Sequence, residues 1–285
     1  MSLKLKSIAG ALSLLAATAV SGAAQAGYFI TPYAQLGSGS DNGYVANGPS
    51  SGSATVQNGG EATSDVDMTA GTIKTFLSFT GQDVTGGDFG QAAGVFGDRV
   101  TFTAAQGSAI NFGIDFDGLI YGYDDEPGLD DNFQIGVIAR LRVFDPSAGA
   151  TANNFAVQSG ALVSDDIVLD FSNPDYSFYH ELNESLAGSL VTTGGVNSYD
   201  VFVSFSIFSA MNGHPASVYM DFLNTATFGI TADPGVTYTS EAGLLGSDIT
   251  PAAAVPEPAA WALMILGFGA AGAMVRRRRA ALVPA

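Results

Sequence analysis

The sequence predicts an all-β fold, an antiparallel β-sandwich of the jelly-roll type, and three observations support this class. Apolar residues alternate with polar or glycine residues in several segments, as in half-buried strands. Turn signals such as Glu126-Pro127-Gly128 and Asp233-Pro234-Gly235 separate these segments. The body of the chain shows no helical period, apart from a turn or two near residues 180–190. We therefore expect roughly ten to twelve short strands. We favour a sandwich over an up-and-down barrel or a β-helix; a β-helix would need a fixed internal repeat, and none occurs.

The N-terminal residues predict a secretory signal peptide. Lys4 and Lys6 precede an apolar stretch at residues 8–20, which is too short for a permanent membrane anchor. Small residues follow at Ala24 and Ala26, the pattern at which signal peptides are cleaved. We expect residues 1–26 to form the signal-peptide helix and the exported body to begin at Gly27.

The exported body is expected to span residues 27–255. Its first part, residues 37–64, is rich in Gly, Ser, Asn and Thr and has few large apolar residues. This composition is typical of turns and of segments that bury little surface. We therefore expect a long loop or a poorly ordered arm there, with regular strands beginning near Val66.

The strand predictions rest on where large apolar side chains recur. In residues 110–117 they occupy every second position and form one face. Residues 166–171 and 217–222 show the same alternation. Residues 133–144 and 199–208 carry apolar groups on both faces, as central strands covered on each side would. The inward residues of the three alternating segments are expected to be Ile110, Phe112, Ile114, Phe116, Ile167, Leu169, Phe171, Val218, Met220 and Phe222.

Composition limits the partners and the chemistry of the body. Only Lys74, Arg99, Arg140 and Arg142 are basic within it, against 26 of the 27 acidic residues, a formal charge of about −22. Such a surface repels nucleic acid and anionic lipid, so DNA or RNA binding is excluded. The absence of cysteine excludes disulfides, thiolate catalysis and cysteine metal sites. The exported body must therefore be held together by its core alone.

A cluster of acidic residues predicts a calcium site at the rim of the sandwich. Two acids end the strand at residues 110–117, and the others follow what we interpret as a tyrosine-rich turn at residues 118–123. Calcium prefers such oxygen ligands, but Leu119 and Ile120 occupy the positions where an EF-hand needs an oxygen ligand and glycine. A solvated acidic loop that keeps a sheet edge soluble explains the cluster as well. The candidate ligands are Asp115, Asp117, Asp124, Asp125, Glu126, Asp130 and Asp131.

Catalytic motifs are scarce. The two histidines, His180 and His214, are interpreted as surface or loop residues, because no metal or triad partners can be assigned to them. A glycosidase needs two facing carboxylates, and so many acids supply such pairs by chance. Exposed aromatic residues are more informative, since their rings can stack on sugars, although core packing explains them equally well. The candidate rings are Tyr121, Tyr123, Tyr176, Phe178 and Tyr179.

The C-terminal residues form an ordered series of signals. Pro256-Glu257-Pro258 cannot continue a helix and should stay accessible, and Trp261-Ala262 follows. Residues 259–275 are apolar and, as a helix, rise about 25 Å, enough to just span a hydrocarbon core of about 30 Å. Arg276, Arg277, Arg278 and Arg279 then hold the C-terminus in the cytoplasm. Residues 267–272 match a dinucleotide fingerprint by letter, but inside this helix they are better explained as small residues that allow close packing.

This tail, residues 256–285, resembles the PEP-CTERM sorting signal in its Pro-Glu-Pro-x-x-Trp-Ala form, which also carries the name ice-binding protein C-terminal domain. The resemblance covers less than a tenth of the chain. It implies an exosortase partner, a membrane protease-transpeptidase of Gram-negative bacteria that produce exopolysaccharide, which would process the chain near the triplet. An ordinary membrane anchor would explain the helix and the arginines, but not the triplet or Trp-Ala. Ice recognition would have to come from the body, where no regular Thr-x-Thr ladder occurs.

Two functions remain open. The first is a non-enzymatic surface or extracellular-matrix protein that passes through the inner membrane by its tail, with exopolysaccharide as a partner and with glycan or cation binding left open. The second is a secreted carbohydrate-active enzyme on a jelly roll. The scarcity of basic and histidine residues favours the first.

Overall fold

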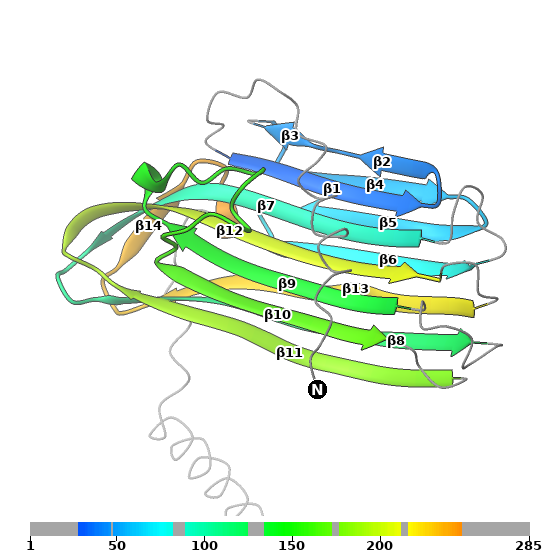
Figure 1. The fold of residues 1–285 in the computed structure, drawn as a ribbon. Coiled ribbons are helices and arrows are strands. Elements are labelled where there is room, and N and C mark those ends of the chain that lie inside the picture. The colour runs from blue at the N-terminus through cyan, green and yellow to red at the C-terminus, as the bar shows by residue number, and fades with distance from the viewer. Residues whose placement is uncertain are drawn as a thin grey trace, which may run out of the picture. The chain divides into compact units, whose positions relative to one another are not determined.

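The computed structural model describes residues 28–46, 48–81, 89–124, 134–172, 177–211 and 216–246. These residues form fourteen strands and two short 3-10 helices, η1 (Pro146–Ala148) and η2 (Leu244–Gly246). The strands build two antiparallel sheets, as Figure 1 shows, with sheet A in front of sheet B in that view. Sheet A contains β1 (Tyr28–Leu36), β2 (Gly39–Asn42), β3 (Val45–Ala46), β7 (Phe89–Ala104), β9 (Gln134–Phe144), β10 (Val163–Ser172), β12 (Gly195–Ala210) and β14 (Thr237–Ser240). Sheet B contains β4 (Ser51–Gln57), β5 (Gly60–Asp67), β6 (Thr72–Thr80), β8 (Ala109–Asp124), β11 (Ser177–Val191) and β13 (Ala216–Ala232).

The predicted β-sandwich is confirmed, and its strand order is that of a jelly roll. From β6 to β13 the chain changes sheet at every connection except the one between β9 and β10. The neighbours in sheet A are β10-β9-β12-β7, and those in sheet B are β11-β8-β13-β6. Eight strands divided in this way between two sheets form the double Greek key of a jelly roll. Strands β1 to β5 extend both sheets beyond β7 and β6.

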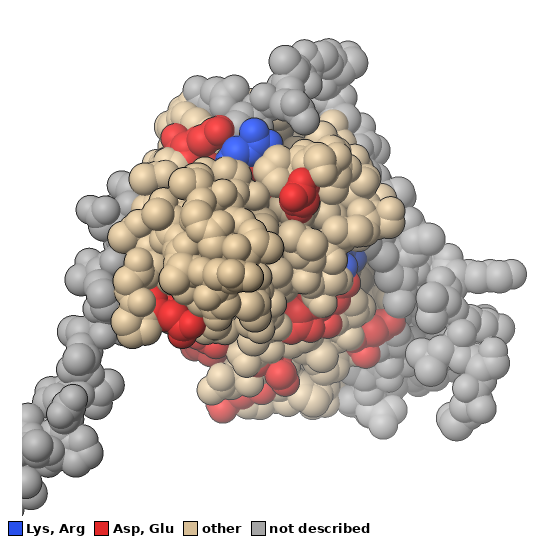
Figure 2. Space-filling view, turned by 90° about the vertical axis from the view of Figure 1, so that its left-hand side faces the viewer, with Lys and Arg blue, Asp and Glu red and all other residues tan. Residues whose placement is uncertain are grey.

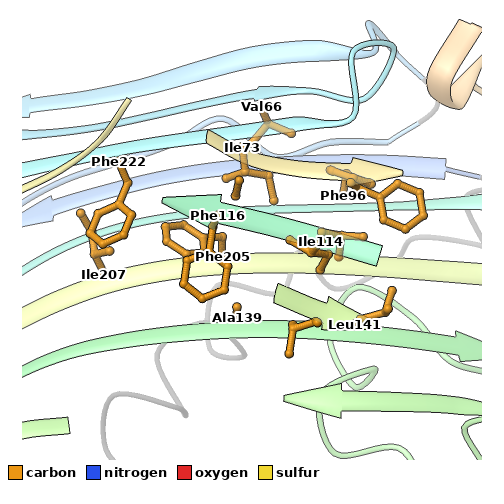
Figure 3. Close-up of a cluster of buried hydrophobic side chains, with 14 of the residues drawn as sticks. Val66, Ile73, Phe96, Ile114, Phe116, Ala139, Leu141, Phe205, Ile207 and Phe222 are labelled. Carbon is orange, nitrogen blue, oxygen red and sulfur yellow. The ribbon is translucent and has the colours of Figure 1, made fainter. Parts of the chain in front are cut away.

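The core lies between the two sheets and follows the predicted alternation. Ile110, Phe112, Ile114 and Phe116 of β8 are all buried, and so are Val218, Met220 and Phe222 of β13. Phenylalanine rings join the layers, as Figure 3 shows: Phe205 of sheet A lies 5.1 Å from Phe116 and 5.2 Å from Phe222 of sheet B, between ring centroids. The inward residues of β10 (Ile167, Leu169 and Phe171) are only partly buried, since β10 is an edge strand of sheet A.

Strands β9 and β12 are covered on both faces, as their sequences predict. Every residue of β9 except Gln134 is buried, and so are residues 199–209 of β12. On the outer face, the connection between β9 and β10 folds back over sheet A and forms a second small core. There the ring of Phe155 stacks on Phe202 at 5.2 Å and 7°. This cover buries the outward-facing Phe144 of β9 and Phe202 of β12.

Two local predictions from the sequence are wrong. Residues 37–64 contain β2, β3 and β4 and half of β5, so they are not a loop or arm. Their inward positions are filled by Ala54, Ala62 and Ser64, which are too small to produce a visible alternation of large apolar groups. Residues 180–190 lie in β11 and form no helical turn.

The last described residues of the body are held against β7 and the turn between β5 and β6 by a buried carboxylate and by backbone hydrogen bonds. Asp98 of β7 is 3 % exposed, and both of its oxygens accept from the backbone N–H of Ala242 at 3.3 Å. Burial raises the pKa of Asp98 to about 6, although hydrogen bonds from Ser240 and from backbone amides oppose this shift. Leu244 is buried in the core, and Leu245 donates to the carbonyl of Met68.

The chain divides into two compact units, residues 1–249 and 250–285. The predicted signal peptide with Ala24 and Ala26, and the whole predicted sorting tail, lie outside the described residues. Within the described part of the chain, no helix has the length and apolar character needed to cross a membrane.

Candidate ligand-binding face

Three exposed tyrosines lie in one line across the outer face of sheet B. Tyr179 of β11 pairs in register with Tyr121 of β8, and Tyr121 pairs on its other side with Tyr219 of β13. Their side chains are 58 %, 43 % and 36 % exposed, respectively. Adjacent strands lie about 4.8 Å apart, so the outer two residues are separated by about 10 Å. We call these three residues the tyrosine row.

The alternation of each strand turns these rings outward. The residues on either side of Tyr121 are Ile120 and Gly122, which are both buried. A Cβ atom added to Gly122 would lie only 2.2 Å from the ring of Phe178, so that ring packs directly against the inner face of β8 at this point. Val218 and Met220 flank Tyr219 and are buried in the core. A packed layer of apolar side chains therefore holds the backbone from which the tyrosine row projects.

Carboxylates lie two residues along from the outer members of the row. The hydroxyl of Tyr179 donates to Glu181, and this hydrogen bond raises the pKa of Tyr179. The hydroxyl of Tyr219 donates to Asp221 at 3.2 Å, and desolvation, together with the charge of Asp221, raises the pKa of Tyr219. Both phenols therefore stay protonated at neutral pH, and both carboxylates remain available to accept further hydrogen bonds.

A further ring and a hollow extend the row toward β6. Phe76 of β6 packs edge to face against Tyr219, with centroids 5.3 Å apart and planes at 84°. A hollow of about 410 Å³ opens beside Tyr121 and Tyr219 and is also lined by polar residues, among them Ser78, Thr80 and Ser217. Apolar ring faces beside hydroxyl groups are the features that bind sugars, whose faces are apolar and whose edges carry hydroxyls.

A second hollow lies farther along the same face. It has a volume of about 520 Å³ and is lined by β4, β5 and β6 residues that include Ser53, Asp65, Thr72 and Lys74. Lys74 and Asp65 are register partners on β6 and β5. Along β6, Phe76 lies between Lys74, which lines this hollow, and Ser78, which lines the first.

The structure brings together some of the aromatic residues singled out in the sequence. Tyr121, Tyr123 and Tyr179 all face outward on sheet B, with Tyr123 39 % exposed. Phe178 instead turns inward, where its ring lies 5.8 Å from Phe171. Tyr176 lies outside the described residues.

Two members of this face, Tyr219 and Phe76, were missed in the sequence. The signal for Tyr219 was present, because it lies between the predicted inward residues Val218 and Met220 and must point outward. Phe76 has the same kind of signal, since it lies between the inward Thr75 and Leu77 of β6. What the sequence lacked was the register that places Tyr219 beside Tyr121.

Of the seven predicted calcium ligands, the three in the described part of the chain all belong to β8 and are spread along it. Asp115 and Asp117 lie inside β8, which runs without a break to Asp124, so the predicted turn at residues 118–123 is wrong. Asp124 lies seven positions beyond Asp117, about 23 Å along the strand. Asp125, Glu126, Asp130 and Asp131 lie outside the described residues. In the part of the chain that is described, no three His, Cys, Asp or Glu side chains are grouped to hold a metal.

Histidine and arginine residues have structural partners. The ring of His180 packs against Phe171 at 4.8 Å on exposed strand β11, and His214 lies outside the described residues. Arg142 makes two 2.6 Å hydrogen bonds to Asp166, and Arg99 bonds Asp200 at 2.7 Å. Burial lowers the pKa of Arg140, which lies 3.9 Å from Asp166. All three arginines lie on sheet A, away from the tyrosine row.

The surface of the body is acidic, as its composition predicts. Figure 2 shows acidic side chains spread over the end of the body that it faces, whereas basic side chains are confined to small areas. With the arginines paired on sheet A, Lys74 is the basic residue on the strands of sheet B that the structure describes. Any ligand of the outer face of sheet B therefore meets mainly hydroxyls, rings and carboxylates.

Two solved structures show distant likenesses to this chain. The enzymatically active domain of tailspike protein 4 from bacteriophage CBA120 is 13 % identical, with a TM-score of 0.21, and covers 65 % of this chain and 21 % of that one. This chain therefore spans about a fifth of the tailspike's length. A structure from the β-sandwich superfamily of carbohydrate-binding modules is 8 % identical, with a TM-score of 0.18, and covers 70 % of this chain and 85 % of that one. Likenesses this weak carry no argument about function.

Comparison with sequence families is informative for the tail alone. No curated protein matches the chain. A family model described as the PEP-CTERM protein-sorting motif matches residues 254–279, the region that holds the triplet, Trp261, the apolar segment and the arginines. Such a signal implies export, processing by an exosortase and membrane-associated sorting toward the cell surface. The C-terminal tail of this chain is a PEP-CTERM protein-sorting motif.

Proposed function

We propose that this exported protein is a non-enzymatic, glycan-binding component of the cell surface or extracellular matrix. The observation that carries the proposal is the tyrosine row, in which Tyr179, Tyr121 and Tyr219 occupy directly paired register positions on an outer sheet face. Rings kept exposed in one line form a flat platform for the apolar faces of successive sugar units. Exopolysaccharide of the producing cell is the partner that fits an exosortase-sorted protein with such a platform.

The surrounding polar groups suit the edges of a sugar. Glu181 and Asp221 offer acceptors for hydroxyl groups, and the hollow beside Tyr121 and Tyr219 adds the hydroxyls of Ser78 and Ser217. The packed strands beneath the row hold these groups in place before a ligand arrives, which lowers the entropic cost of binding. Rings on rigid strands are better positioned for recognition than rings on loops.

The alternative explanation for the rings is sheet stability. Aromatic pairs across strands stabilise a sheet by about 0.2–1 kcal/mol each, without any ligand. This explanation predicts that removal of a ring lowers stability and changes no binding property. The two explanations therefore separate in a binding experiment in which the stability of each variant is measured.

Binding should be measured on a glycan array with the exported form produced from the full chain. We expect the wild type to bind a subset of oligosaccharides and Tyr121→Ala to bind them at least tenfold more weakly, about 1.4 kcal/mol. Tyr121→Phe keeps the ring and should retain most of the affinity. Thr231→Ala, on the same face of β13 but twelve residues from Tyr219, is the matched control and should bind as the wild type does. Equal binding by Tyr121→Ala and wild type would refute the proposal.

A carbohydrate-active enzyme is the second candidate, and one observation favours it. Glu181 and Asp221 lie on either side of Leu119 in register, so their backbones are two strand spacings, about 10 Å, apart. Inverting glycosidases place their carboxyl groups about 6.5–9.5 Å apart. Release of new reducing ends from a bound glycan, abolished in Glu181→Gln and in Asp221→Asn, would favour this candidate over the binding protein.

A further inference from the structure

We infer that the tyrosine row binds an uncharged glycan chain and discriminates against glycans that carry acidic groups. This inference rests on the proposed glycan-binding function and specifies the chemical class of the ligand. It comes from the charges that surround the row on sheet B, and from the place of the arginines on the other sheet.

Carboxylates flank the row on the same outer face. Glu61 of β5 is the register partner of Ser78, which in turn pairs with Tyr219, so it lies on the line of the row itself. Glu181 and Asp221 lie two residues along their strands from Tyr179 and Tyr219, and both pair in register with Leu119. Asp117 lies two residues beyond Leu119 on β8. A sugar that covers the three rings is therefore surrounded by negative charge on one side and at one end.

Cations that could bind an acidic sugar lie elsewhere among the described residues. Arg99, Arg140 and Arg142 belong to sheet A and lie beside Asp200 and Asp166. Lys74 is four residues along β6 from Ser78, about 13 Å from the line of the row. This exceeds the distance of about 8 Å over which salt screens charges under physiological conditions. Recognition of uronic acids by a bidentate arginine, the usual protein partner of a carboxylate, is therefore not available at the row.

The carboxylates suit hydroxyl groups instead. One oxygen of Asp221 accepts from the Tyr219 hydroxyl, and the other accepts from the backbone N–H of Leu223 at 3.1 Å. An ionised carboxylate has about four acceptor sites, so Asp221 keeps capacity for sugar hydroxyls. Each such bond has a charged acceptor and is stronger than a bond between neutral groups. The same carboxylate repels an acidic sugar in the same position.

The direction of the chain follows from the line of the rings. Tyr179, Tyr121 and Tyr219 lie on three neighbouring strands, so a glycan that stacks on all three crosses the strands of sheet B. Beyond Tyr219 it reaches Phe76 and the hollow lined by Ser78 and Thr80.

The test uses pairs of oligosaccharides that differ only in acidic groups. The exported form is titrated with glucan and glucuronan, mannan and mannuronan, and galactan and galacturonan fragments of equal length. We expect a neutral member to bind and its uronate counterpart to bind at least tenfold more weakly at low salt, with a smaller difference in 0.5 M sodium chloride because salt screens surface charge. In Glu181→Gln combined with Asp221→Asn, the same difference should shrink.

The control and the contrary outcomes are distinct. Glu184→Gln removes one charge from β11 at a position that alternates away from the tyrosine row, and it should leave the difference unchanged. Equal or tighter binding of the uronates would overturn this inference and leave the proposed glycan-binding function standing. Failure of every pair to bind would remove both.

Discussion

Substitution of Asp98 by asparagine should change how the stability of the body depends on pH. Burial raises the pKa of Asp98 from 3.8 to about 6 in the folded protein. Because the folded value lies above the unfolded one, the carboxyl contributes stability that is fully present below pH 3.8 and is lost as pH rises through about 6. A shift of about two units corresponds to about 3 kcal/mol at 1.36 kcal/mol per unit. Asparagine has no proton to gain, so this contribution disappears in the variant.

The assay is urea denaturation of wild type and Asp98→Asn at half-unit steps from pH 4 to 7.5. The free energy of unfolding of the wild type, relative to the variant, should fall by about 2.4 kcal/mol from pH 4 to pH 7, because a small part of the contribution is already lost at pH 4. Glu184→Gln, which removes an exposed carboxylate from β11, should show no such trend against the wild type. A constant difference between wild type and Asp98→Asn over this range would refute the reasoning. It would mean that the hydrogen bonds from Ala242 and Ser240 compensate the charge in full.

Three further predictions concern the core, the calcium ligands and the processing of the chain. Phe205→Ala removes the ring that joins Phe116 to Phe222 and should lower the free energy of unfolding by about 3–5 kcal/mol in the same denaturation assay; a loss below 1 kcal/mol would contradict the described packing. Any calcium-specific rise in Tm should persist in the double variant Asp115→Asn, Asp117→Asn, because these two residues lie far along β8 from Asp124. If a calorimetric scan shows that the double variant loses the rise in Tm, Asp115 and Asp117 are calcium ligands. The intact mass of the exported form should show a start at Gly27 and loss of residues 276–279; retention of the arginines would favour an ordinary anchor. Replacement of Pro256 and Pro258 by alanine should leave the chain bound to the membrane, because the helix could then extend into the cleavage region.

The sequence predicted the fold well where side chains are large. The alternation of Ile110, Phe112, Ile114 and Phe116 is visible by inspection, because bulky apolar groups fill the space between two sheets. The strands at residues 37–64 were not predicted, because their inward positions hold small residues such as Ala54 and Ala62. Burial of a methyl group gives little periodic signal, although it fills a narrow part of the core as effectively.

The candidate site was only partly predictable for a different reason. The outward direction of Tyr121, Tyr179 and Tyr219 follows from local alternation, but their meeting in one line depends on register between strands far apart in the chain. The ion pair between Arg99 and Asp200, which are 101 residues apart, is hidden in the same way. Pairing of this kind is decided by the packing of the whole sandwich and by no local pattern.

The strand order also governs when the body can fold. Strand β12 lies between β9 and β7, and β13 lies between β8 and β6, so neither sheet is continuous until residues 195–232 are in place. A chain exported from its N-terminus delivers these central strands late, with only β14 following them among the described strands. Contacts between residues so distant in sequence form slowly, because the chain loses the entropy of closing a long loop before the contacts stabilise it. The jelly roll can therefore be completed only after residues up to 232, most of the body, have become available for pairing.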